Sequence, residues 1–526
     1  MPRATADKTL YYFAVGGTGA LTVEPLLLLC AAGVGPRRLA VVLIDADAAN
    51  PALARAQALL KNYEQVREAF GKPEQGFFST ELVRTQRSQS VWSPLGVDAA
   101  QGGDLSLERF AERARMAGPN RAAGTLFDLL FSTEQQKEQL HEGFRGNPAI
   151  GSILMHGLKE STFLKELMNS ARQDTGALFY AAGSIFGGTG ASALPVLAEV
   201  LTGAGIARER IGAALVTPYY SLPEPGQGEQ QNGRLKPDSS IFLRNTAAAL
   251  PTYTHGHAKY GALYVIGDAS SLPQVRTTYS AGGATQRNDP HALELFIALA
   301  AVDFVSREWE AADPPASRMM YATVGGEEPG WQDLPLTEDE KKELLTYIVA
   351  ANFYLQYFGE TRSGPRQQEL GAELDRMVWF RDIGLDAGFV RARSRELDLL
   401  GRWFASSWSY LWASSHNTVA LRLVDFSGPS AASVNAPQEY ARSAEHATIP
   451  LPRVDKCLAG FSPRQKKGGF LGLGKGGDDQ ITSLAEVFAK FNTVKRSDVT
   501  GLPGFLAYLH DGIRKFVDDW YSPAKA

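Results

Sequence analysis

Residues 177–192 read ALFYAAGSIFGGTGAS, an apolar run followed at once by a glycine-rich turn. The run Ala177–Ala182 predicts a short buried strand, and Leu194–Leu201 beyond the turn predicts a helix. Glycine lets backbone N–H groups come close to an anion, and a helix N-terminus adds a partial positive charge. The stretch therefore predicts a phosphate-binding turn, with a tight packing turn as the alternative.

A second stretch near the N-terminus repeats this arrangement. Leu10–Val15 is an apolar run, residues 15–20 (VGGTGA) form the turn, and Ala20–Ala32 predicts the helix that follows. Taken alone, this turn also suits a Rossmann dinucleotide fold or simple packing. Two such turns in one sheet are better explained by two loops that converge on one polyphosphate.

Further apolar runs indicate the rest of the sheet: Leu39–Ile44, Ile211–Thr217 and Ala262–Ile266. Helical patterns lie between the runs, so we expect an α/β fold with a doubly wound, mostly parallel sheet. The stretch from Asn50 to Gly146 is polar and helical without clear strand signals. We interpret it as an elaboration on that sheet.

Composition excludes several classes of protein. Of the 526 residues, 44% are hydrophobic and 21% are charged, a balance typical of a soluble globular protein. The net charge of −4 gives no reason to expect nucleic acid as a partner. Only Cys30 and Cys457 are present, so we expect no disulfide framework or zinc site, and a reducing compartment fits. The longest apolar run, Pro25–Val34, is too short to span a bilayer, so we expect a cytoplasmic protein without membrane insertion.

The charge of a bound polyphosphate must be met without a P-loop lysine, because the chain has no Gly-x-x-x-x-Gly-Lys-Ser/Thr motif. Backbone amides, Thr and Ser hydroxyls, helix dipoles and a bound cation remain. Asp45 and Asp47 follow the second strand and are placed to hold that cation or its waters. Helix capping or a plain turn is the alternative role for both.

Several motifs, in this order, resemble those of the tubulin/FtsZ superfamily of GTPases. The first glycine turn and the two aspartates correspond to its first two loops. Asn147-Pro148-Ala149-Ile150-Gly151 is similar to its γ-phosphate loop, and residues 186–192 (FGGTGAS) are similar to its glycine-rich signature. Residues 217–220 (TPYY) are a looser version of the ribose-side loop. The resemblance covers about Leu10 to Glu308.

This resemblance implies a binding site for GTP or GDP with Mg²⁺, and self-association into an oligomer or filament. The implied metal contacts, direct or indirect, are Asp45 and Asp47. The implied nucleotide contacts are Gly16, Gly17, Thr18, Gly19, Asp45, Asp47, Gly146, Asn147, Gly187, Gly188, Thr189, Gly190, Ser192, Thr217, Pro218, Glu224, Asp268 and Asn288.

The chain departs from the family pattern at three points. Phe186 replaces the first glycine of the signature, and Asp268 stands where FtsZ has an asparagine near the guanine base. No acidic loop of the form Asn-x-Asp-x-x-Asp follows the fifth predicted strand and its helix. In the family this loop comes from the next subunit and orients the attacking water. The nearest acidic residues here are Glu308, Glu310 and Asp313, which become the candidate catalytic groups, with solvated surface charges as the alternative. With these departures, the chain resembles the divergent tubulin-like proteins of bacteria rather than FtsZ itself.

We expect a nucleotide-binding domain over residues 8–287, with a helical insertion over about 51–145. A central buried helix follows at 288–308, because its apolar residues recur on nearly every face. Residues 309–526 are expected to form a helix-rich C-terminal domain that offers a surface for protein partners. Thr337–Phe358 and Arg391–Trp412 are its longest predicted helices.

Three functions stay open at this point. The first is a GTPase that self-associates and hydrolyses GTP slowly, with the active site completed at the subunit interface. The second is a nucleotide-binding scaffold for partner proteins that does not hydrolyse. The third is a Rossmann-type NAD(P) oxidoreductase, in which Asp45 would bind ribose hydroxyls.

Overall fold

The structure is a computed structural model of the chain. It describes residues 8–47, 50–84, 91–96, 105–116, 121–140, 143–144, 146–174, 176–221, 239–268, 274–275, 290–309, 318–324, 328–358, 378–384, 388, 392–416, 420–428, 430–435, 448–463, 487, 490–494 and 499–523.

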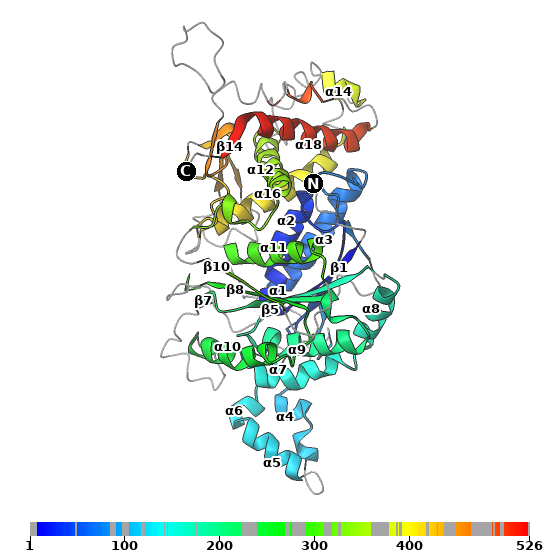
Figure 1. The fold of residues 1–526 in the computed structure, drawn as a ribbon, viewed down its shortest axis with the longest axis vertical. Coiled ribbons are helices and arrows are strands. Elements are labelled where there is room, and N and C mark those ends of the chain that lie inside the picture. Colours follow the sequence, from blue (N-terminus) through cyan, green and yellow to red (C-terminus); the bar gives the residue numbers. More distant parts are fainter. Residues whose placement is uncertain are drawn as a thin grey trace.

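A parallel sheet forms the centre of the molecule, with its strands in the order β10-β8-β6-β5-β1-β2-β3 and β4 also paired with β2 (Figure 1). Its strands are β1 (Thr9–Val15), β2 (Arg38–Ile44), β3 (Glu81–Leu82), β4 (Val91–Trp92), β5 (Leu178–Ser184), β6 (Ile211–Val216), β8 (Ala262–Asp268) and β10 (Arg318–Val324). All their pairings are parallel. The chain builds outward from β1 in one direction and from β5 in the other. The expected doubly wound, mostly parallel sheet is confirmed.

Both faces of the sheet are buried, which explains why its strands are continuous apolar runs. In β1, Leu10, Tyr12 and Ala14 enter one apolar cluster. The residues between them enter a second cluster on the other face. The side chains of a strand alternate between faces, so a strand covered on both sides is apolar at most of its positions.

Helices cover the two faces (Figure 1). The face turned toward the C-terminal region carries α2 (Val23–Ala31), α3 (Pro51–Ala69) and α11 (Ala292–Ser306). The other face carries α7 (Pro148–Met155), α8 (Thr162–Arg172), α9 (Gly188–Gly203) and part of α10 (Ser239–Thr254). The short α1 (Gly16–Leu21) leads from β1 into α2, with a break at Thr22 inside the single helix that the sequence predicts.

The central helix α11 runs from Ala292 to Ser306, within the range 288–308 that the sequence predicts. Every residue of α11 from Ala292 to Val305 is buried, because the helix lies between the sheet and the C-terminal helices. Its buried Asp303 accepts a hydrogen bond from the hydroxyl of Tyr264 in β8 at 2.8 Å. The two long helices expected further on are also present, as α12 (Glu338–Tyr357) and α16 (Ser394–Ser414).

The stretch between Asn50 and Gly146 is not a single helical elaboration on the sheet, as the sequence pattern predicts, because part of it belongs to the body of the molecule. Helix α3 packs within the body of the molecule, and β3 and β4 extend the sheet beside β2. Of the helices described in this stretch, α4 (Leu107–Phe110), α5 (Arg121–Leu130) and α6 (Thr133–Gln136) project beyond α7 (Figure 1). Two-residue strands are too short to carry a periodic pattern, which is why they escaped the sequence analysis.

The C-terminal region also adds a strand to the sheet, since β10 is its edge strand beside β8. The remaining elements are β7 (Tyr220–Ser221), β9 (Gln274–Val275), α14 (Val378–Asp382), β11 (Ser430–Asn435), β12 (Thr448–Pro452), β13 (Phe461–Pro463), α18 (Gly501–Trp520) and β14 (Tyr521–Pro523), with 3₁₀ turns at Arg113–Arg115, His156–Leu158, Arg208–Arg210, Trp331–Asp333 and Val454–Lys456. Helices α12, α16 and α18 share one apolar cluster with the upper face of the sheet. Among the described residues, no helix has the length and apolar character needed to cross a bilayer.

A half-buried ionic cluster joins α18 to α12 and to the segment after α3. His510 of α18 contacts Glu343 of α12 at 2.8 Å and its neighbour Asp511 at 2.7 Å, and its ring packs edge-on against Phe77. Arg514 also binds Glu343 at 2.5 Å. Burial lowers the pKa of His510, but the bonds to Asp511 and Glu343 outweigh it, and the pKa is raised to about 9.

This cluster makes stability depend on pH in the alkaline range. A histidine whose pKa rises on folding contributes stability that is present below its unfolded pKa and lost as pH rises through the folded value. We expect the free energy of unfolding to fall between about pH 6.5 and 9, by about 2 kcal/mol. His510→Gln should flatten this dependence in urea titrations at several pH values. The exposed His255→Gln serves as control, and equal slopes in all three proteins would contradict the assignment.

Candidate functional site

The two glycine turns lie side by side at the carboxyl ends of β1 and β5. Gly16 has φ of +71°, which favours glycine, and a Cβ there would lie 3.2 Å from Cβ of Thr189. β1 and β5 are the neighbouring strands between which the order of the sheet reverses. Open α/β sheets bind ligands at the carboxyl edge at this switch point. The sheet therefore brings both predicted turns to the position where a ligand is expected.

Both turns continue into helices that approach the sheet more closely than a side chain would allow. A Cβ at Gly19 would lie 2.4 Å from the carbonyl oxygen of Ala182, and one at Gly190 would lie 2.2 Å from that of Ser184. Neither α1 nor α9 has a side-chain cap at its N-terminus. The first backbone N–H groups of a helix have no partner within it, so these two ends are suited to an anion.

The predicted γ-phosphate turn packs against the N-terminus of α9. A Cβ at Gly188 would lie 2.6 Å from Cβ of Phe144 and 3.4 Å from the backbone nitrogen of Asn147. The Asn147 side chain accepts hydrogen bonds from the N–H groups of Ala149 and Ile150, and so caps α7. Three segments that are distant in sequence thus meet around one helix end.

Asp45 and Asp47 lie beside these turns, and each is only 3% exposed. The Thr189 hydroxyl donates to Asp45 Oδ1 at 3.1 Å, and the Asp47 N–H donates to the same oxygen at 3.3 Å. Burial and the charge of Asp47 raise the pKa of Asp45 to about 7, although these hydrogen bonds act in the opposite direction. A cation at this position would favour the charged form of both carboxylates.

This donor set fits Mg²⁺ bound together with phosphate. Among the described residues, no group of three or more His, Cys, Asp or Glu side chains is arranged to hold a metal by itself. Mg²⁺ in nucleotide sites is commonly held by one or two carboxylates, with phosphate oxygens and waters completing its shell. Asp45 and Asp47 supply such a pair.

The predicted ribose and base contacts lie along the same edge, at the ends of β6 and β8. Thr217 and Pro218 follow β6 and are half-buried, and Asp268 ends β8 and is also half-buried. A Cβ at Gly267 would lie 1.7 Å from the Thr217 hydroxyl oxygen, so only glycine fits beside this threonine. The two strand ends are therefore in direct contact.

Other predicted residues have structural partners. The Ser192 hydroxyl is buried and donates to the carbonyl oxygens of Gly188 and Thr189 within α9. A Cβ at Gly187 would lie 2.6 Å from the Ser184 hydroxyl oxygen, and one at Gly17 would lie 2.9 Å from Nδ2 of Asn50. Thr18 lies in the first turn of α1 and Gly146, with φ of +75°, lies just before the cap of α7.

The candidate catalytic residue Glu308 lies at the opposite side of the sheet from the glycine turns, near the amino-terminal ends of the strands. It precedes Trp309, whose ring lies under the guanidinium of Arg318 at 5.7 Å, and Arg318 is the first residue of β10. Glu308 is exposed there, whereas the glycine turns follow the last residues of their strands. The remaining candidates lie outside the described residues: Glu224, Asn288, Glu310 and Asp313.

Two asparagines at the site escaped the sequence analysis. Asn50 caps α3 by accepting from the Ala52 N–H, and its Nδ2 lies 3.4 Å from Asp45 Oδ2. The Asn-Pro pair at the start of α3 is a recognisable cap pattern and could have identified it. Asn245 of α10 binds two of the turns through backbone oxygens, and no local pattern indicates such a contact.

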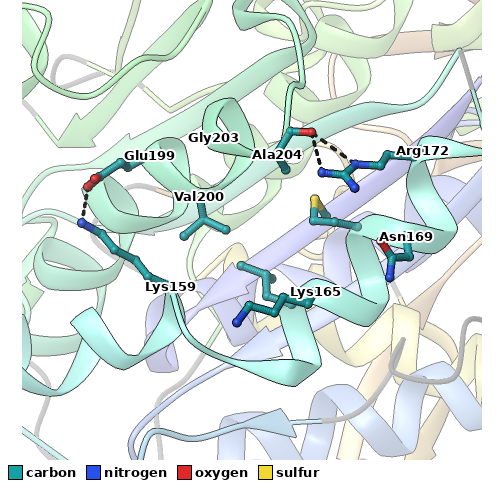
Figure 2. A pocket seen from close by; sticks show the side chains of 10 residues that line it. Lys159, Lys165, Asn169, Arg172, Glu199, Val200, Gly203 and Ala204 are labelled. Atoms are coloured by element: carbon teal, nitrogen blue, oxygen red, sulfur yellow. Dashed lines mark hydrogen bonds and ion pairs between the residues drawn. The ribbon is translucent and has the colours of Figure 1, made fainter.

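A separate hollow of about 330 Å³ lies between α8 and the C-terminal half of α9 (Figure 2). Its rim includes Lys159, paired with Glu199 at 2.7 Å, and Arg172, which binds the carbonyl oxygen of Ala204. The glycine turn is at the other end of α9, about 20 Å away for a helix of this length. The hollow is therefore not part of the candidate site.

Neither the family models nor the curated proteins give a match to the sequence. Among solved structures, one match is "CetZ2 from Haloferax volcanii - GTPgS bound protofilament", at 14% identity and a TM-score of 0.27. The match covers 57% of this chain and 58% of that one, which is less than two thirds of its length.

The close approach of α9 to β5 predicts a difference between two glycines of one helix. Gly190→Ala should destabilise the protein by about 1–3 kcal/mol, because the new methyl group overlaps a backbone carbonyl that cannot move aside freely. Gly203→Ala in the last turn of α9 meets nothing within 4 Å and should be neutral or slightly stabilising. Urea denaturation of both variants tests this. Equal stability of the two would contradict the packing.

Proposed function

We propose that the chain binds GTP or GDP with Mg²⁺ at the carboxyl edge of its sheet and self-associates as a distant relative of the tubulin/FtsZ proteins. The observation that carries this proposal is the meeting of three turns around the N-terminus of α9. Gly16 adjoins Thr189 on one side, and Asn147 adjoins Gly188 on another. A polyphosphate needs several donors along its length, and this arrangement supplies them from separate segments.

The proposed roles follow from position. The N-termini of α1 and α9 receive the phosphates, and the Thr189 hydroxyl lies between the phosphates and Asp45. Asp45 and Asp47 hold the cation directly or through water. Thr217 and Asp268 face the nucleoside. Glu224 and Asn288 are also proposed to contact the nucleoside.

Self-association is proposed to be head to tail, because the candidate acid and the phosphate turns lie at opposite edges of the sheet. The seven residues of β8 span about 20 Å, so Glu308 cannot reach the turns of its own subunit. A heterologous contact between unlike surfaces brings the two edges of successive copies together. Glu308, with Glu310 and Asp313, would then complete the active site of the neighbour, and hydrolysis would depend on assembly.

A nucleotide-binding scaffold without hydrolysis remains the second candidate. It is favoured by α5, whose side chains at Leu126, Leu129 and Leu130 are 56%, 79% and 60% exposed and share one helix face. Exposed apolar faces of this kind commonly bind another protein. The oxidoreductase reading has less support, because Asp45 is buried and bonded to Thr189 of the second turn, which a dinucleotide site does not use.

A cytoplasmic location is part of the proposal. Cys30 and Cys457 are both buried and do not form a disulfide with each other, which suits a reducing compartment.

The nucleotide site is tested by two threonines of α9. Thr189→Val keeps the shape of the side chain but removes the hydroxyl that donates to Asp45, so GTP affinity in the presence of Mg²⁺ should fall about tenfold or more. Thr202→Val, near the other end of the helix, removes only hydrogen bonds to the carbonyl oxygens of Ala198 and Glu199 within α9 and should leave affinity unchanged. Isothermal titration with GTP measures both. Unchanged affinity in Thr189→Val would remove this turn from the site.

Completion of the active site between subunits is tested by mixing variants. Glu308→Gln should bind GTP normally but lose most of the assembly-dependent hydrolysis, whereas Thr189→Val should bind poorly. In an equal mixture, about one quarter of head-to-tail junctions combine an intact turn with an intact acid, so part of the activity should return. Phosphate release is the measurement. No loss of turnover in Glu308→Gln would exclude this residue, and loss without recovery on mixing would argue against the interface.

A further inference from the structure

Asn245 of α10 links two of the turns through a single side-chain nitrogen. Its Nδ2 donates to the carbonyl oxygen of Gly146 at 2.8 Å and to that of Phe186 at 2.9 Å. Both acceptors are carbonyl oxygens, so only the amide nitrogen of Asn245 fits this position. Gly146 precedes the cap of α7, and Phe186 precedes the glycines that open α9. One side-chain nitrogen thus bridges the two turns.

The same face of α10 also holds Phe186 by apolar contact. Phe242 lies one helical turn before Asn245, and its ring is 4.8 Å from that of Phe186. Tyr220 packs edge-on against Phe186 at 5.8 Å. Phe186 is 1% exposed and stands where the resembling signature has a glycine. The aromatic ring at this position therefore attaches the turn to α10.

The turns at Gly16 and Gly146, which both adjoin the N-terminus of α9, are held in place by different contacts. The turn at Gly16 is held to the sheet by the close contact of Gly19 with the Ala182 carbonyl. The turn at Gly146 is held to the α9 turn by Asn245 and by the contact of Gly188 with Phe144. A phosphate chain lying across this helix end would meet the first turn at one end and the Gly146 turn at the other.

We propose that Asn245 is a positioning residue that holds the Gly146 turn in place for the terminal phosphate, and so sets the preference for a nucleoside triphosphate over a diphosphate. This inference rests on the proposed nucleotide site and deepens it. A diphosphate would depend on the turns that the sheet holds directly. A third phosphate would depend in addition on the turn that Asn245 holds.

Asn245→Asp is the sharpest test, because the variant is nearly isosteric but places a carboxylate oxygen against two carbonyl oxygens. The affinity for GTP should fall about tenfold or more, while the affinity for GDP should change much less. Asn245→Ala removes both hydrogen bonds without repulsion and should show the same effect in weaker form. Asn169→Asp, on the exposed face of α8 beside the hollow in Figure 2, controls for the added charge. Titration calorimetry with GTP and with GDP, each with Mg²⁺, gives the ratio of the two affinities for each protein.

The ratio distinguishes positioning from a general structural role. A lowered preference for GTP in both Asn245 variants, with an unchanged ratio in Asn169→Asp, supports the inference. An unchanged ratio, whether both affinities fall together or neither falls, overturns it. If Asn245→Asp does not fold, Asn245→Ala decides by the same criterion. Wild-type protein that binds neither nucleotide would instead overturn the proposed function, and the inference with it.

Discussion

The site depends on two places where a helix lies so close to a strand that no side chain fits between them. At Gly19 and at Gly190, a single added methyl carbon would overlap a backbone carbonyl oxygen of β5. This closeness draws the N-termini of α1 and α9 onto neighbouring strand ends, and the positions of Asp45, Thr189 and the Gly146 turn follow from it. Glycine is required here because backbone must meet backbone, whatever ligand is bound.

The electrostatics of the site carry a cost that the rest of the fold has to offset. Asp45 and Asp47 are buried close together, and burial and the charge of Asp47 both raise the pKa of Asp45. The hydrogen bonds from Thr189 and the Asp47 N–H reduce that cost only in part. Buried like charges of this kind are common at sites that bind a cation, where binding requires an arrangement that lowers the stability of the free protein. The large cores on both faces of the sheet supply the stability that makes this tolerable.

The parallel sheet also gives the molecule two unlike edges. All strand ends with glycine turns lie at one edge, and the segment that follows α11 lies at the other. Helix α11, buried along its length, spans the sheet and connects the two. Because strand direction is the same throughout, the two edges cannot be related by symmetry within one chain. A contact between two copies that uses both ends of the strands must therefore be head to tail, with unlike surfaces meeting.

The sequence by itself determined the strands β1, β2, β5, β6 and β8, the two glycine turns and the central helix. These are local properties: β1 reads as a continuous apolar run because both of its faces are covered, and α11 is apolar all round for the same reason. It did not determine the short strands β3 and β4 or the edge strand β10, whose pairing depends on neighbours rather than on pattern. Only the tertiary structure placed Asn245 between two turns and Glu308 at the far edge. Both placements concern residues that are distant along the chain, and neither periodicity nor a local motif predicts where such residues lie relative to each other in space.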